Sequence, residues 1–184
     1  MSLVPSRECG NCTVCCRVLP IRSPELNKTS HVLCRHCDEG RGCRIYETRP
    51  ALCRSYYCGW RMWEALPDDW RPDKSGVFVD RVRFLPGAGD EVPAHYDRRF
   101  MVQLLLLRAD AIDGQHFAEV VWTLVSAGLP VFLGICGPPG FQNALVFLNE
   151  SVKDAVARRD RAAVVAVVRQ AAATASAHDF RPLA

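Results

Sequence analysis

The stretch that decides the architecture runs from Cys9 to Cys58 and reads CGNCTVCCRVLPIRSPELNKTSHVLCRHCDEGRGCRIYETRPALCRSYYC. It holds nine of the ten cysteines in the 184-residue chain. Cysteines gathered this densely either bind metal or form disulfides, because core packing alone does not require so many thiols. The choice between these two chemistries determines how the first third of the chain is held together.

The rest of the sequence favours metal over disulfides. The N-terminal segment before Cys9 lacks the apolar stretch of a signal peptide, and the longest apolar runs are far too short to span a bilayer. We therefore expect a cytoplasmic protein with no membrane partner, and thiols in the cytosol are kept reduced. The net charge of +3 is too small to argue for a nucleic-acid partner.

Composition changes after Trp60, since the last 124 residues contain one cysteine. The sequence predicts a cysteine-rich metal-binding module over residues 1–60 and an α+β domain over residues 61–184. Apolar patterning predicts strands at Val77–Phe84, Met101–Leu107, Val131–Ile135 and Ala144–Leu148. It predicts helices over about 114–127, with Asp113 as N-cap, over 151–154, and from about Asp160 to Ala175.

The order strand, strand, helix, strand, strand, helix predicts an α+β fold, with a layer of helices on a small, mostly antiparallel sheet. The loop-rich cysteine module packs against this domain, and we expect Trp63 and Trp70 to join the two parts. Residues 136–143, CGPPGFQN, are glycine-rich but lack the Gly-Lys-Ser/Thr ending of a phosphate loop. They favour a hairpin turn, because proline removes the amide donors that a phosphate requires.

The candidate metal ligands are all nine thiols of the stretch: Cys9, Cys12, Cys15, Cys16, Cys34, Cys37, Cys43, Cys53 and Cys58. The spacing Cys9-x2-Cys12-x2-Cys15 is the one with which a loop binds three irons of a [4Fe–4S] cluster. The fourth ligand then comes from Cys16 or from the distant block. Cys34-x2-Cys37 is a spacing that suits zinc equally well. Nine thiols exceed the four that one site requires, so two sites, or one site with free thiols, both fit.

Arginines lie between the cysteines of the second block, at positions 35, 41, 44, 49 and 54. They could offset the negative charge of a thiolate site and donate hydrogen bonds to sulfur. We take Tyr46, Arg49 and Arg54 as candidate cofactor-binding residues, with Tyr46 and Arg49 fixing the loop by stacking and hydrogen bonding. His36 is expected beside the site rather than as a ligand, and Cys136 as a small buried residue.

Together these motifs resemble a known family. Cys9-x2-Cys12-x2-Cys15-Cys16, then Cys34-Arg-His-Cys37, Gly42-Cys43, Arg49-Pro-Ala-Leu-Cys53-Arg54 and Cys58-Gly-Trp60 look like the CxxCxxCC cysteine-cluster family. That family is described as a zinc- or iron-chelating domain and often labelled an iron–sulfur oxidoreductase. The resemblance covers roughly residues 9–60 and implies eight metal-type cysteines. Cys37 is an extra, at a position where many members carry leucine.

The resulting hypothesis is a cytosolic, bacterial-type metal-binding protein that holds a zinc ion or a [4Fe–4S] cluster through its N-terminal cysteines. Two alternatives stay open: an iron–sulfur-dependent redox or protein-modification enzyme, and an adaptor that zinc merely stabilises. The sequence predicts no particular reaction, and the expected partner is a protein or a small molecule of unspecified kind.

Overall fold

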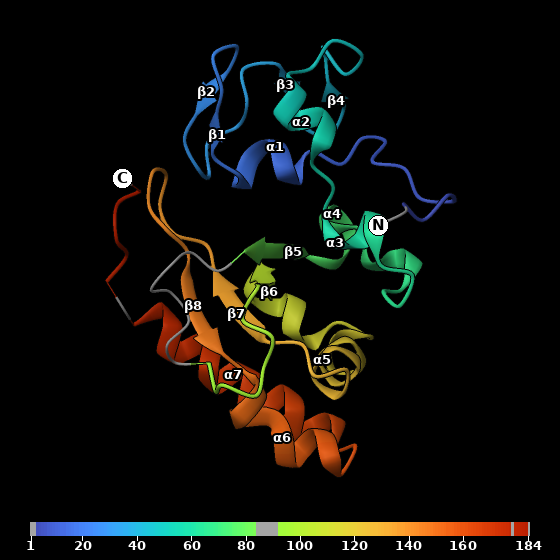
Figure 1. Ribbon diagram of the computed structural model, residues 1–184, viewed down its shortest axis with the longest axis vertical. Helices are drawn as coiled ribbons and strands as arrows, with labels where there is room; N and C mark the ends of the chain where they lie inside the picture. Colours follow the sequence, from blue (N-terminus) through green and yellow to red (C-terminus); the bar gives the residue numbers. More distant parts are fainter. Residues whose placement is uncertain (1–2, 84–91, 178, 184) are drawn as a thin grey trace.

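The computed structural model describes residues 3–83, 92–177 and 179–183. Figure 1 shows the cysteine-rich module at the top, a four-stranded sheet in the middle and long helices beneath it. The fold is therefore α+β, with N-terminal cysteine-rich loops, as the sequence predicts.

The sheet has the strand order β5-β6-β7-β8. Its strands are β5 (Val77–Arg83), β6 (Phe100–Leu106), β7 (Val131–Ile135) and β8 (Ala144–Phe147), close to the predicted ranges. Phe84, the last residue of the first predicted strand, lies outside the described residues. Two of the three pairings are antiparallel, and β6 pairs with β7 in parallel. The parallel pairing arises because a helical segment crosses back between these two strands.

That crossover consists of η2 (Ala109–Asp113) and α5 (Phe117–Ser126), and it differs from the prediction. Asp113 does not cap α5: it ends η2 and forms an ion pair with Arg169, while His116 stands at the N-cap without a side-chain cap bond. The short predicted helix extends to α6 (Asn149–Ala157). α7 (Arg161–Ser176) begins as predicted, and the Asp160 carboxylate accepts a hydrogen bond from Ala163 N at 3.0 Å.

One face of the sheet and the helices enclose the main core. Val79, Leu104 and Leu133 point to this face and are fully buried with Phe117 of α5 and Val168 of α7. Burial of each such side chain stabilises the fold by about 2 kcal/mol. Trp70 and Trp63 also pack against this core, and Trp70 lies 6.1 Å from Phe117 between ring centroids.

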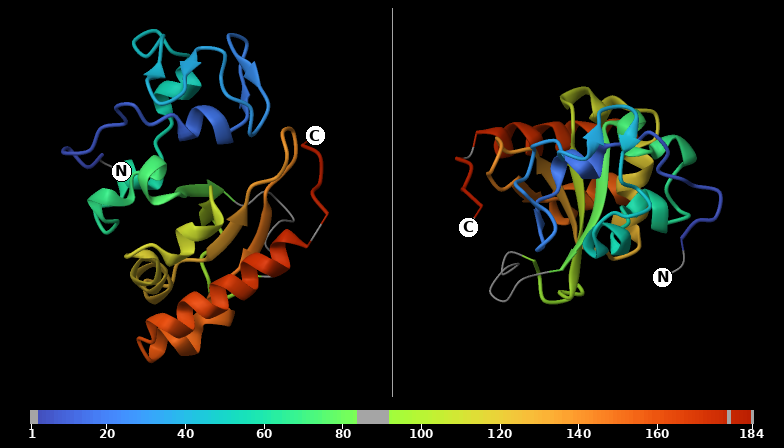
Figure 2. Two further views of the ribbon diagram at one scale, coloured as in Figure 1. Left: turned by 180° about the vertical axis from the view of Figure 1, so that it is seen from behind. Right: turned by 90° about the horizontal axis from the view of Figure 1, so that it is seen from above.

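The cysteine module covers the opposite face. Val18 of α1 (Val14–Val18) packs against Phe78 and Leu105, which alternate with the core-facing residues of β5 and β6. Tyr56 stacks on Phe78 and donates a hydrogen bond from its hydroxyl to Asp80 Oδ1 at 2.9 Å. Figure 2 shows the module and the long helices on opposite sides of the sheet.

Regular structure in the module is short. β1 (Ile21–Arg22) pairs with β2 (Asn27–Lys28), β3 (Cys37–Asp38) pairs with β4 (Gly42–Cys43), and α2 spans Ala51–Ser55. The bridge to the sheet consists of α3 (Gly59–Met62), η1 (Asp68–Trp70) and α4 (Pro72–Ser75). Trp60, which ends the predicted module, is buried in the core of the sheet. The module's own packing therefore ends before this residue.

Arg7 connects the N-terminal segment to the α3–η1 part of the bridge. Its buried guanidinium donates to the backbone oxygens of Trp60, Trp63 and Leu66, and it forms an ion pair with Asp68. Sequence reasoning missed this residue, because nothing in its neighbourhood distinguishes it from a surface arginine.

The loop after β7 forms the predicted hairpin and reaches the module. Ser30 Oγ donates to Phe141 O at 3.0 Å, and Gly140 N donates to Ser30 O at 3.2 Å. The C-terminal tail joins the same loop, since Leu183 N donates to Gly140 O at 2.8 Å. Within the described residues, no helix has both the length and the apolar character required to cross a membrane.

We predict that Arg7→Ala lowers the free energy of unfolding by about 3 kcal/mol, because it leaves buried carbonyls without their donor. Urea denaturation followed by tryptophan fluorescence measures this loss. Arg158→Ala, at an exposed position, is the control and should change stability by no more than about 0.5 kcal/mol. Equal losses in both variants would contradict the role assigned to Arg7.

A second prediction concerns Asp80, whose carboxyl pKa is raised by burial, although hydrogen bonds from Tyr56 and the Arg81 amide oppose the shift. A raised pKa in the folded state means that stability is lost as the pH rises through it. Asp80→Asn keeps an oxygen that accepts both bonds and removes the buried charge. Its stability relative to wild type should therefore increase as the pH rises from about 4 to 7. A difference that does not vary with pH in urea titrations would refute this account.

Candidate metal centre

Five thiols lie close to one another in the module, and four of them border one small apolar core. This five-thiol group consists of Cys16, Cys34, Cys37, Cys43 and Cys53. Cys34 and Cys37 are buried in that core with Ile21 and Leu26, and Cys16 and Cys53 pack against it. Cys43 joins them as the strand partner of Cys37. The group draws its members from α1, β3, β4, α2 and the loop before β3.

Local backbone structure brings these cysteines together. Cys37 N donates to Cys34 O at 2.9 Å, which closes the turn of the Cys-x2-Cys spacing. Gly42 has a φ of 115°, which the tight β3–β4 hairpin requires and an L side chain rarely adopts. Cys34 N donates to Cys16 O at 3.0 Å and links the second block to α1. His36 N donates to the Cys34 sulfur at 3.5 Å, a contact that would stabilise a thiolate.

Three other thiols lie together near the bridge. This three-thiol group consists of Cys9, Cys12 and Cys58, and the first two share a turn in which Cys12 N donates to Cys9 O at 2.9 Å. Cys15 stands between the groups: it packs in the same apolar cluster as Cys58, and its thiol interacts with that of Cys16. The spatial division thus differs from the division in sequence, because Cys16 joins the second block and Cys58 joins the first.

Burial raises the pKa values of Cys37 and Cys58, and neighbouring thiols add to the shift at both. Burial, followed by the neighbouring Cys16, raises the pKa of Cys37 to about 12. Burial also raises the pKa of Cys58 to about 11, and Cys9 and Cys12 add to the shift. For Cys16 the largest cause of the raised pKa is the hydrogen bond with Cys15. Thiolates crowded in this way require a compensating positive charge.

Two basic residues supply part of that charge. Arg49 lowers the pKa values of Cys9, Cys43 and Cys53 and so acts on thiols of both groups, although burial outweighs it at each of them. Lys28 is buried and donates from Nζ to the backbone oxygens of Arg17 and Thr29, both at 2.9 Å. Burial lowers the lysine pKa, and Cys34 and Cys16 oppose that shift. Sequence reasoning missed Lys28, since a lone lysine in a two-residue strand carries no signal.

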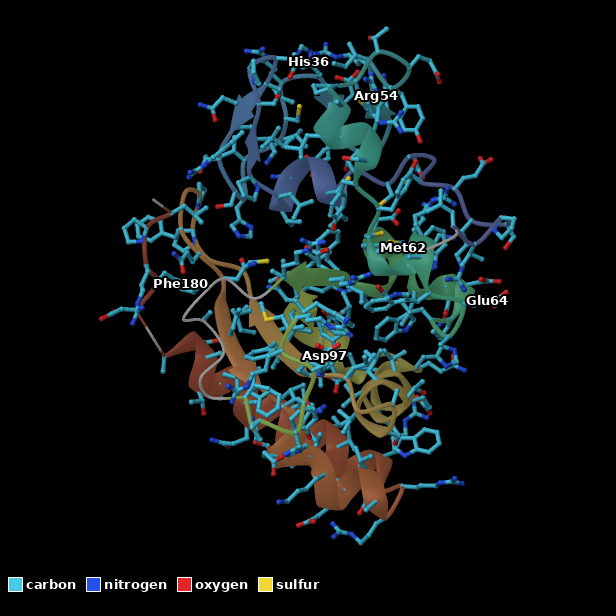
Figure 3. All side chains as sticks on the ribbon, viewed as in Figure 1. His36, Arg54, Met62, Glu64, Asp97 and Phe180 are labelled. Atoms are coloured by element: carbon cyan, nitrogen blue, oxygen red, sulfur yellow. The ribbon has the colours of Figure 1, made fainter. Side chains whose placement is uncertain are left out.

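The other predicted cofactor-binding residues lie on the surface of the module. The Arg49 guanidinium stacks over the Tyr46 ring at 3.8 Å, and Arg54 donates to Arg49 O at 2.8 Å. These contacts fix the loop between β4 and α2. His36 and Arg54 lie at the end of the module away from the sheet (Figure 3). His36 accepts a hydrogen bond from Arg35 Nε at 3.2 Å.

Cys136, the tenth cysteine, lies apart from both groups. It is half-buried rather than fully buried and packs beside Phe78 and Leu105 on the module side of the sheet. Its thiol donates to Leu106 O at 3.3 Å, and burial raises its pKa to about 11. Because Cys136 is half-buried but lies outside both groups, it serves as a control cysteine in the experiments on the other nine thiols.

Among the residues that the structure describes, no three His, Cys, Asp or Glu side chains stand close enough together to hold a metal ion. The donor set nevertheless suits a thiophilic metal in kind and number, because the five-thiol group exceeds the four ligands of a zinc ion or cubane cluster. All ten thiols are free, so none is already committed to a disulfide.

Comparisons with known proteins returned no matching family model, curated protein or solved structure for this chain. The resemblance to the CxxCxxCC family therefore stays a prediction that rests on the motifs alone.

The position of Arg49 predicts an effect on thiol reactivity. In metal-free protein, Arg49→Ala should slow alkylation of Cys9, Cys43 and Cys53 by iodoacetamide, because loss of the guanidinium raises their pKa values. Mass spectrometry of the alkylated peptides measures each rate. Alkylation of Cys136 should not change, since only burial shifts its pKa. Uniform slowing at all four thiols would indicate a general structural effect instead.

Proposed function

We propose that this protein binds a thiophilic metal, as a zinc ion or an iron–sulfur cluster, through its N-terminal cysteines. One observation carries the proposal: four thiols from separate segments gather around a single small core, and Cys43 joins them as the strand partner of Cys37. The three-thiol group and Cys15 offer ligands for a second site. Tyr46, Arg49 and Arg54 hold the loop that borders the five-thiol group.

The small size of that core supports the proposal. Its buried members are Ile21, Leu26, Cys34 and Cys37, so half of the core consists of cysteine. A core this small does not offset the conformational entropy of the surrounding loops, and small domains of this kind depend on a metal or disulfides. A bound metal would supply the missing free energy directly, because its binding is coupled to folding.

Metal fits better than disulfides on two grounds. Every cysteine thiol in the structure is free, including adjacent ones such as Cys15 and Cys16. The proposal also assigns the protein to the cytosol, where disulfides are rare and thiols are available as ligands. A metal closed by four thiolates would be structural, whereas three thiolates and an open position would allow catalysis.

The test is metal analysis of anaerobically purified protein. We expect bound zinc in a colourless protein, or iron and sulfide in a brown protein with broad visible absorbance; these two outcomes distinguish the metals. Cys43→Ala should lower both the metal content and the free energy of unfolding, because it removes a ligand of the five-thiol group. Cys12→Ala tests the three-thiol group in the same way.

Cys136→Ala is the matched control, since this cysteine is also half-buried but lies outside both groups. It should keep the full metal content and lose no more than about 1 kcal/mol of stability. Unchanged metal content and melting in both the Cys12 and Cys43 variants would overturn the proposal. So would wild-type protein that contains no metal and does not take up zinc or iron.

A further inference from the structure

A cavity of about 480 Å³ lies between the module and the sheet. Its floor includes Leu107 and Cys136, which directly follow β6 and β7. Residues of α1 and the 39–40 turn line it from the module side. The cavity therefore lies at the carboxyl ends of the two parallel strands. Its volume lies within the usual range of small-molecule sites.

The charged groups of this cavity are already paired with each other or with neighbours. Arg17 forms an ion pair with Glu39 at 2.5 Å, and Asp73 accepts two hydrogen bonds from Arg71, both at 2.7 Å. A charged ligand would have to displace one of these existing partners to gain a counter-charge. The lining thus favours an uncharged molecule.

His31 is the residue of the cavity lining whose ring can present a hydrogen-bond acceptor. Its ring Nε2 lies 2.8 Å from Asn143 Oδ1, and because an amide oxygen only accepts, Nε2 carries the proton. Burial lowers the imidazole pKa, which favours the neutral ring. The Nδ1 atom of a neutral ring with this tautomer is an acceptor. His31 therefore offers an acceptor to a ligand whose group donates an N–H or O–H.

The backbone of His31 is left-handed, with a φ of 59°. Histidine, like asparagine and aspartate, adopts this conformation more often than most residues with a side chain. This turn and the hydrogen bond to Asn143 together hold the His31 ring among the residues that line the cavity.

The remaining lining completes a site for a molecule of mixed character. Val14 and Val18 of α1 join Leu107 and Cys136 as apolar walls. Asn11 accepts from Arg71 through Oδ1, so its amide NH₂ group is left to donate, and the Thr13 hydroxyl makes no cap bond to α1.

We propose that this cavity binds a small uncharged alcohol or amide with an apolar body, whose O–H or N–H group donates to His31 Nδ1. The site lies on α1, the helix that also carries Cys15 and Cys16, so a ligand bound there contacts the element that supports the thiols. The inference is separate from the metal proposal, because the proposed hydrogen bond is made to His31 and not to a thiol; Asp73 is the lining residue that interacts with a candidate metal ligand, Cys12.

The test uses a matched series of one-ring probes: benzamide, benzyl alcohol, benzoate, benzylamine and toluene. Binding to the full-length protein, as purified with any metal it carries, is measured by NMR titration. We expect saturable binding of benzamide and benzyl alcohol. Benzoate and benzylamine should bind about tenfold more weakly because of their charge, and toluene about tenfold more weakly because it cannot donate.

Two variants locate the site. His31→Gly keeps the left-handed backbone accessible and removes the imidazole, so benzamide should bind about tenfold more weakly while toluene is unaffected. Val14→Phe should fill the cavity and abolish binding of all probes. Leu52→Phe, at an exposed position on α2, is the control and should bind like wild type.

Benzamide binding that is unchanged in His31→Gly, or charged probes that bind as tightly as benzamide, would overturn the inference. Metal content measured on the same samples separates the two proposals. Benzamide binding by metal-free wild type would leave this inference intact and count against the metal proposal. Metal-loaded protein without saturable benzamide binding would do the reverse.

Discussion

The thiols of Cys34 and Cys37 occupy positions where a larger domain would bury leucine or phenylalanine. This constraint shapes the rest of the module, because two aliphatic side chains, Ile21 and Leu26, complete its buried core. Strands of two residues and five-residue helices follow from it, since longer elements require a larger apolar face to pack against. The module therefore depends on the sheet beneath it, against which α1 and Tyr56 pack.

The two faces of the sheet have different partners: one packs against the helices and the other against the cysteine module. Along β5, Val77 and Val79 face the helices, whereas Phe78 and Asp80 face the module. The module face is only partly apolar: it carries the buried Tyr56–Asp80 hydrogen bond and the cavity lined by His31. A module that covers a polar face loosely leaves room at the boundary, which is where the proposed small-molecule site lies.

Much of the sheet could be predicted from local patterns. The apolar run Val131–Ile135 gave a strand with the expected bounds, and α7 begins where the sequence predicts, because both signals are contained within a few residues. The prediction that Asp113 caps α5 was wrong, because its carboxylate pairs instead with Arg169, which is 56 residues away in the sequence. The grouping of Cys16 with the second block was not legible either, since it depends on contacts between distant segments. Arg7 and Lys28 owe their roles to burial, and His31 owes its role to a hydrogen bond with Asn143, 112 residues away; neither feature has a signature in a single polar residue.

The hairpin loop after β7 has a consequence for the order in which the chain can assemble. It receives Ser30 and His31 from the module and Arg181 and Leu183 from the tail. The cysteine stretch is synthesised early. Phe141 and Asn143, which bond to Ser30 and His31, are synthesised more than a hundred residues later. Contacts of such long separation close late in folding, because loop closure must come first. During synthesis, the cysteine stretch is therefore exposed to solvent before the loop that contacts Ser30 and His31 has been made.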